Sequence, residues 1–141
     1  QMGILDIIHT FYAIIGVIGN LTLLSIMFTT RRNELKGFAI IISNVAVVDL
    51  VEIAVDVFEV PGLVPYGNYL ILLFQGPCAK YGAEVCYRCH LVMLHLMFHS
   101  MYLIAYSFWY RFRILDKTPL TSLNMQMSLL LLFIPNGVPM V

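Results

Sequence analysis

Four apolar segments, each about twenty residues long or longer, dominate the sequence and restrict what the chain can fold into. An apolar α-helix of about 20 residues crosses the hydrocarbon core of a bilayer. The predicted helices cover about 7–29, 38–60, 82–110 and 123–141. Only 11% of the residues are charged, whereas a soluble domain has about 25%. We therefore predict an all-α polytopic transmembrane bundle in a lipid bilayer, with residues 1–141 as a single membrane domain.

The positive charges predict how the bundle is oriented in the membrane. Six of the 8 basic residues fall in the first and third connectors: Arg31, Arg32, Lys36, Arg111, Arg113 and Lys117. Cytoplasmic loops carry an excess of Lys and Arg, so we expect both connectors in the cytoplasm and the N-terminus outside. The formal net charge of +0 argues against a nucleic-acid partner, because phosphate binding needs a surplus of positive charge.

The second connector contains an apolar run, Tyr69–Phe74, that is too short to span a membrane. Pro and Gly residues before it end the second helix, and Gly76-Pro77 introduces the third. The run lies either on the membrane interface or over the bundle, and the sequence leaves both possibilities open.

Four acidic residues form a stripe on the second predicted helix. At about 100° per residue, Asp49, Glu52, Asp56 and Glu59 fall within an arc of roughly 80°. A carboxylate that faces lipid costs about 2.5 kcal/mol or more at mid-bilayer, so the stripe should face the bundle interior or a water-filled cavity. It is either a polar contact between packed helices or the wall of a ligand or ion cavity.

Depth counting suggests further polar contacts inside the membrane. Asn20, Asp49 and His99 lie at about the same mid-membrane depth and are candidates for one hydrogen-bond network. Lys80, Glu84 and Arg88 follow at four-residue spacing, which is typical of a solvated ion-pair face. Arg88 lies deeper than the other two, where Asp56 or Glu59 is its expected partner.

The stretch "CYRCH" at Cys86–His90 has the spacing of a c-type haem attachment site. It runs directly into a spanning helix, however, where a large planar cofactor has no protein envelope. Zinc held by Cys86 and His95 is excluded, because nine helical residues rise about 13 Å. His95 and His99 need further ligands from another helix, so we interpret them as buried hydrogen-bonding residues and expect no cofactor and no metal.

The cysteine count and the first residue suggest an incomplete chain. Three cysteines cannot all pair with one another, and the sequence begins at Gln1. We therefore expect a fragment or a processed product.

Several motifs resemble those of seven-helix receptors. Gly19-Asn20, the run "NVAVVDL" with Asp49, and "YRF" at Tyr110–Phe112 are similar to motifs of helices one, two and three in rhodopsin-like receptors. The run from Gly76 to Leu115, with its Gly-Pro-Cys, Val-Cys-Tyr, Met-Leu-His-Leu and His-Ser steps, more closely resembles the nematode serpentine chemoreceptors of class delta. "IPN" at 134–136 also resembles that family.

The resemblance implies a seven-helix G-protein-coupled receptor fold, of which this chain carries helices one to four. It implies a receptor rather than an enzyme, one that binds an external small-molecule chemical cue and activates a heterotrimeric G protein. It also implies a location in the plasma membrane of sensory cells.

The resemblance further implies roles for particular residues. The candidates are Glu52, Asp56, Arg88 and His90 for ligand binding, Tyr110 and Arg111 for G-protein coupling, and Asn20 and Asp49 for a polar core. Cys86 is the candidate for a disulfide to the second extracellular loop, beyond the end of this chain. Tyr110 departs from the family pattern of rhodopsin-like receptors, which have an acidic residue before the arginine.

An alternative function is a transmembrane metal or proton transporter. It would use the carboxylate stripe of the second helix together with His95 and His99, which lie one turn apart on the third.

Overall fold

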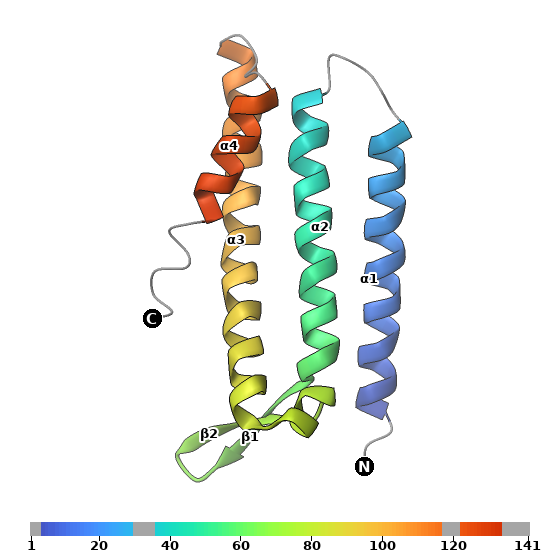
Figure 1. Cartoon of the computed structure of the whole chain (residues 1–141), viewed down its shortest axis with the longest axis vertical. Helices are drawn as coiled ribbons and strands as arrows, with labels where there is room; N and C mark the ends of the chain where they lie inside the picture. The colour runs from blue at the N-terminus through green and yellow to red at the C-terminus, as the bar shows by residue number, and fades with distance from the viewer. Residues whose placement is uncertain (1–3, 30–35, 117–121, 134–141) are drawn as a thin grey trace.

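Three long helices stand side by side in the protein, with a shorter fourth helix against the third (Figure 1). The computed structural model describes residues 4–29, 36–116 and 122–133. The helices are α1 (Ile4–Thr29), α2 (Lys36–Glu59), α3 (Ala83–Asp116) and α4 (Ser122–Phe133). Three of them are long and apolar enough to cross a membrane, over Ile7–Thr29, Gly37–Glu59 and Ala83–Leu115. The predicted all-α transmembrane fold is confirmed.

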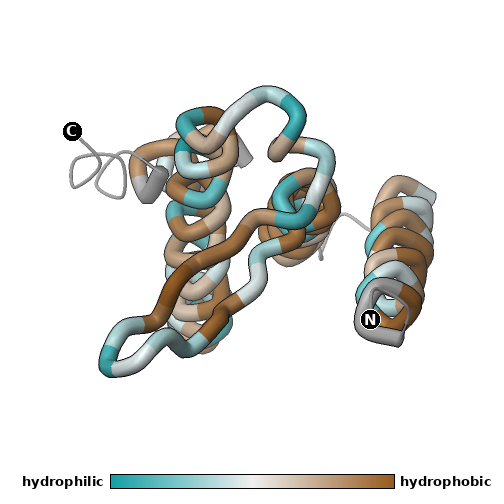
Figure 2. Tube along the Cα trace, turned by 90° about the horizontal axis from the view of Figure 1, so that it is seen from below, coloured by the Kyte–Doolittle hydropathy of each residue, from teal (hydrophilic) through white to brown (hydrophobic). Residues whose placement is uncertain are grey.

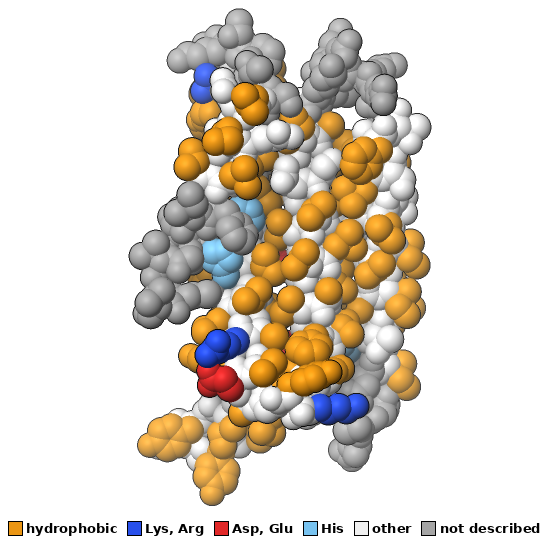
Figure 3. All heavy atoms as spheres, viewed as in Figure 1, with side chains coloured by type: hydrophobic (Ala, Val, Ile, Leu, Met, Phe, Trp, Pro, Cys, Tyr) orange, Lys and Arg blue, Asp and Glu red, His pale blue; other side chains and the backbone are white. Residues whose placement is uncertain are grey.

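The helix surfaces suit an apolar environment. Hydrophobic side chains are spread along the whole length of the visible face, and the visible Lys and Arg side chains lie toward its two ends (Figure 3). Hydroxyl groups on α1 donate hydrogen bonds to backbone carbonyls one turn earlier, Thr22 to Ile18 and Ser25 to Leu21. In lipid no water can satisfy such a donor, so the helix backbone accepts its hydrogen bond.

Two predicted helix boundaries differ from the structure. The third helix continues to Asp116, six residues past the predicted end. Only 12 residues of the fourth helix are described, as Ser122–Phe133, about 18 Å at 1.5 Å per residue. The rest of its predicted span, together with the "IPN" motif at 134–136, lies outside the described residues, so a fourth membrane span stays a prediction.

The second connector folds into a β-hairpin that sequence analysis did not predict. Strands β1 (Pro61–Tyr66) and β2 (Tyr69–Phe74) pair antiparallel, with Tyr66 opposite Tyr69. Gly67 has a positive φ of 57° and occupies the first central position of the two-residue turn, where a type II′ turn requires glycine. We call the end of the bundle that carries this hairpin the hairpin end, and the opposite end the Arg111 end.

A short 3-10 helix, η2 (Pro77–Tyr81), joins the hairpin to α3. Gly82, with a φ of 106°, separates η2 from α3, so the chain reverses there instead of continuing as one helix from Pro77. The backbone of Gly76 donates a hydrogen bond to the carbonyl of Glu59 over 3.1 Å. The hairpin is therefore fixed to the end of α2 at one side and to the start of α3 at the other.

The main hydrophobic core lies near the Arg111 end. Ile41 of α2, Leu103 and Tyr110 of α3, and Met125 and Leu129 of α4 form one buried cluster. Seen along the bundle, α2 stands between α1 and α3 (Figure 2). This central place of α2 decides how its acidic residues are used.

Candidate functional site

The acidic stripe on α2 divides between two helix interfaces. On a helical wheel Asp49 and Asp56 lie about 20° apart, and Glu52 and Glu59 also lie about 20° apart, roughly 60° further round. Asp56 faces α1, whereas Glu52 and Glu59 face α3, as their hydrogen bonds show. The predicted single wall is therefore two sets of contacts, one on each side of α2.

On the α1 side, His9 and Asp56 form a short polar contact between helices at the hairpin end. His9 Nε2 lies 2.7 Å from Asp56 Oδ2, and the two side chains are 30% and 31% exposed. Sequence analysis missed His9. A signal was present, because His9 lies near the start of α1 and Asp56 near the end of an antiparallel α2, which puts them at one depth.

On the α3 side, Glu59 is completely buried, with an exposed fraction of 0%. Its Oε1 accepts from His90 Nδ1 over 3.3 Å. No hydrogen-bond donor in the described part of the chain contacts its Oε2. The ring of Phe74 packs edge-on against the imidazole of His90, with 5.7 Å between centroids, so the hairpin closes over this pair.

The burial of Glu59 predicts unequal costs for losing the two histidines. His90→Ala should lower the free energy of unfolding by about 1–3 kcal/mol, because it leaves a buried carboxylate without its donor. His9→Ala should cost less than about 1 kcal/mol, because Asp56 keeps contact with water. Denaturation of the protein in lipid nanodiscs measures both changes. Equal losses for the two variants would contradict the assigned burial of Glu59.

Two polar residues near mid-membrane have hydrogen-bond partners that the sequence did not predict. The amide nitrogen of Asn20 donates to the carbonyl of Gly16 on its own helix over 3.0 Å. Glu52, assigned from the sequence to ligand binding, accepts from the Ser100 hydroxyl over 2.7 Å. Asp49 is half-buried on α2. A polar core of Asn20 with Asp49 stays a prediction.

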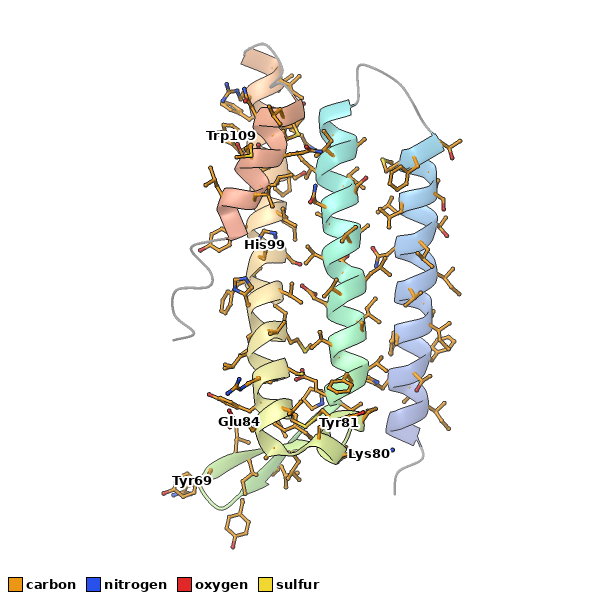
Figure 4. All side chains as sticks on the ribbon, in the orientation of Figure 1. Tyr69, Lys80, Tyr81, Glu84, His99 and Trp109 are labelled. Atoms are coloured by element: carbon orange, nitrogen blue, oxygen red, sulfur yellow. A yellow bond between two sulfur atoms is a disulfide. The ribbon has the colours of Figure 1, made fainter. Side chains whose placement is uncertain are left out.

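The expected partner of Arg88 was wrong. Its guanidinium contacts Glu84 one turn earlier on α3, with Nη2 2.9 Å from Oε1, and not Asp56 or Glu59. The two side chains are 76% and 74% exposed, and Glu84 points away from the bundle near the start of α3 (Figure 4). A residue at i, i+4 on the same helix is already within reach of the guanidinium, so Glu84 competes well with a carboxylate on another helix.

The predicted partner of Cys86 was also wrong. Cys86 forms a disulfide with Cys78 in this chain, with 5.2 Å between the two Cα atoms, and not with a later loop. The reversal at Gly82 brings η2 back beside the first turn of α3, which places the two cysteines together. Cys89 is free and half-buried. With its first sulfur in a disulfide, the "CYRCH" motif does not present the two thiols that c-type haem attachment uses.

No metal centre is formed by the described residues, since no three His, Cys, Asp or Glu side chains among them gather closely enough to hold an ion. His95 and His99 are both buried on α3, and Figure 4 shows His99 near the middle of that helix. The carboxylates of α2 that make the contacts above bond to His9, Ser100 and His90. The transporter function is therefore not favoured.

At the Arg111 end, the two residues proposed for coupling have different surroundings. Tyr110 is buried in the core, with 3% of its surface exposed. Arg111 is exposed, and its guanidinium lies over the ring of Phe38 from α2, 4.8 Å from the centroid. The usual acidic neighbour is replaced by Tyr110, and the Phe38 ring provides a cation–π contact instead.

Two grooves lie at opposite ends of the bundle. The first, of about 390 Å³, is at the hairpin end between α1 and β1, and its lining residues are Ile8, His9, Tyr12, Val60, Pro61, Gly62 and Gln75. The second, of about 340 Å³, is at the Arg111 end, where Arg111, Phe38, Ile41, Ser107 and Phe108 are among the lining residues. The polar side chains in the first groove are His9 and Gln75, together with the hydroxyl of Tyr12, and those in the second are Ser107 and Arg111.

Comparison with known proteins decides the family. The model of the family described as "Serpentine type 7TM GPCR chemoreceptor Srd" matches residues 5–140. The chain belongs to the Srd family of serpentine chemoreceptors. This assignment confirms the family that the third-helix motifs resembled.

Individual relatives agree with the Srd assignment. The chain is 33% identical to serpentine receptor class delta-19 of Caenorhabditis elegans over 135 residues, which are 94% of this chain and 40% of the relative. It is 30% identical to serpentine receptor class delta-1 of the same organism, over 74% of this chain and 28% of the relative. This Srd chain therefore spans less than half the length of these curated relatives. No solved structure matches it.

Proposed function

We propose that this Srd chain contributes the first four helices of a chemosensory receptor in which an external small molecule binds at the hairpin end. The observation that carries the proposal is the groove of about 390 Å³ beside the His9 and Asp56 pair. A partly exposed imidazole and carboxylate at the rim of an otherwise apolar groove resemble the usual composition of small-molecule sites, which are mostly apolar with a few polar groups.

The proposed ligand-binding residues do not contribute equally. Asp56 lies next to the groove through His9, and His90 and Glu59 lie under the hairpin. Glu52 contacts Ser100 between α2 and α3. Arg88 pairs with Glu84 on the exposed surface of α3. In the proposed function it therefore contacts only a ligand that lies against that outer surface.

The proposed output is coupling to a heterotrimeric G protein at the Arg111 end, in the cytoplasm of a sensory cell. Arg111 is exposed beside a groove of about 340 Å³, and its contact with Phe38 links α3 to α2. An agonist favours one arrangement of the bundle only by the difference between its affinities for the two arrangements. Tyr110 contributes to coupling by packing α3 against α2 and α4.

The two ends should respond differently to substitution. The full-length receptor is expressed with a G-protein activation reporter and exposed to a panel of small water-soluble acids, amines and alcohols. For an active compound, Asp56→Asn should raise the half-maximal concentration about tenfold, or ~1.4 kcal/mol of binding. Arg111→Ala should instead lower the maximal response and leave the half-maximal concentration nearly unchanged.

Matched controls exist for both variants. Lys80→Ala removes an exposed charge at the hairpin end, and Arg113→Ala removes a charge two residues from Arg111 whose guanidinium lies over Trp109. Neither should change the response. A response that survives Arg111→Ala unchanged would show that Arg111 does not take part in coupling. Metal flux that depends on Asp56 and His95 would contradict the receptor function and support a transporter.

A further inference from the structure

The β-hairpin is apolar on both of its faces. Paired residues of an antiparallel hairpin point to the same side. One face carries the pairs Pro61 with Phe74, Leu63 with Leu72, and Pro65 with Leu70; the other carries Gly62 with Leu73, Val64 with Ile71, and Tyr66 with Tyr69. A hairpin with one face in water normally alternates apolar and polar residues. Here neither face has the composition of a water-facing surface.

The described part of the chain covers only the base of the hairpin. Phe74 packs on His90, but Leu63, Tyr69 and Leu70 are 66%, 76% and 72% exposed. The strands extend sideways from the bundle, on the side away from α1 (Figure 2). Contiguous exposed apolar surface of this kind marks a contact with a membrane or a partner.

The absence of charged residues from the hairpin, and its position at the end of α2, favour lipid as its partner. No Asp, Glu, Lys, Arg or His occurs between Glu59 and Lys80, so the hairpin offers no charged group to a protein partner. β1 begins two residues after Glu59, where the span Gly37–Glu59 ends. The apolar surface of the hairpin therefore begins at the boundary where the apolar surface of α2 stops.

We propose that the β1–β2 hairpin lies in the interfacial layer of the bilayer leaflet at the hairpin end, with lipid as its partner. Tyr66 and Tyr69 lie side by side at its tip, and Figure 4 shows Tyr69 beyond the helix ends. Tyrosine is enriched where bilayer meets water, because its ring is apolar and its hydroxyl is polar. The two tyrosines lie at the headgroups, and the leucines of the opposite face, Leu63, Leu70 and Leu72, contact the upper acyl chains.

The open edges of the hairpin determine its depth. Unpaired backbone groups are not tolerated against hydrocarbon, where nothing can hydrogen-bond them. Tyr66 and Tyr69 face each other across the two-residue turn, the position of a hydrogen-bonded pair, so the backbone of alternate residues 61, 63 and 65 points to the open edge of β1. Two of these residues, Pro61 and Pro65, have no N–H. The remaining edge groups need polar partners, which glycerol and headgroups supply and the bilayer centre does not.

Lipid quenching of a fluorescent residue tests this depth. An environment-sensitive fluorescent amino acid replaces Tyr69 in the full-length receptor, reconstituted in nanodiscs with phosphatidylcholine brominated either near the head or near the end of its acyl chains. The probe should lose most of its emission to shallow bromines and little to deep ones. The same probe at Ile15, in the span of α1, should show the reverse depth preference.

Each other outcome contradicts the proposal. A blue-shifted probe at position 69 that neither lipid quenches would place the hairpin against another part of the protein. A red-shifted and unquenched probe would place it in water. A second variant, Leu70→Asp, tests the contact itself, because a carboxylate on the lipid face should reduce the quenching of the probe at position 69 by shallow bromines and shift its emission to the red.

Discussion

Replacing Gly76 with alanine should destabilise the hairpin end by about 2–3 kcal/mol, the upper part of the range for overpacked sites. A Cβ at Gly76 would lie 2.7 Å from the backbone carbon of Glu59 and would also overlap the carbonyl oxygen of Phe58. These are backbone atoms of α2 and cannot move aside as a flexible side chain can. The hydrogen bond from Gly76 to the Glu59 carbonyl would lengthen with them.

Denaturation of the protein in nanodiscs measures the Gly76→Ala effect. Gly19→Ala is the matched control, because a Cβ built at Gly19 has no described neighbour within 4 Å apart from its adjacent residues and the backbone of its own helix. Alanine there should leave stability unchanged or raise it by about 0.5–1 kcal/mol, since glycine is a poor helix former. If Gly76→Ala were as stable as Gly19→Ala, the contact between the hairpin and the end of α2 would be refuted.

Truncating Tyr110 to alanine should cost about 3–5 kcal/mol, as large-to-small changes of buried aromatic residues do. Its ring fills the space between α2, α3 and α4 and belongs to the same buried cluster as Ile41 and Met125. The hydroxyl lies against Gly37 so closely that a Cβ there would overlap it. Loss of the ring would leave a cavity, because Gly37, which lies beside the Tyr110 hydroxyl, has no side chain to fill it.

Phe112→Ala provides the comparison for Tyr110→Ala. Phe112 lies half a turn further along α3 and is 73% exposed, so its truncation should change stability by less than about 0.5 kcal/mol. Tyr110→Phe keeps the ring and should retain most of the stability. A Tyr110→Ala loss no larger than that of Phe112→Ala would show that the cluster does not hold the Arg111 end together.

The helices could be predicted from the sequence because long apolar segments have few alternatives in a membrane. The hairpin could not, because its strands are apolar on both faces and lack the two-residue alternation that identifies a strand. Its one local signal was Gly67-Asn68, a turn dipeptide between two apolar runs. The connector was expected to be irregular, and this dipeptide alone was not enough to predict a hairpin there.

The candidate site was predictable in its residue types and not in its pairing. Glu52, Asp56 and Glu59 of the stripe were correctly expected to face other helices, but the sequence does not say which helix lies on which side of α2. His9 pairs with Asp56 and His90 with Glu59 because α2 stands between α1 and α3. Two polar side chains also bond to partners on their own helix instead of partners on another helix, namely Arg88 to Glu84 and Asn20 to the carbonyl of Gly16.

The link between Cys78 and Cys86 bears on which side of the membrane each end of the bundle occupies. Disulfides form and persist in the endoplasmic reticulum lumen and at the cell surface, and are rare in the reducing cytosol. The cross-link lies at the hairpin end, the same end as the start of α1 (Figure 1). The disulfide therefore supports the proposed orientation, in which this end is lumenal during synthesis and extracellular afterwards. This support does not depend on counting basic residues, and it agrees with the proposed coupling of Arg111 to a cytosolic partner.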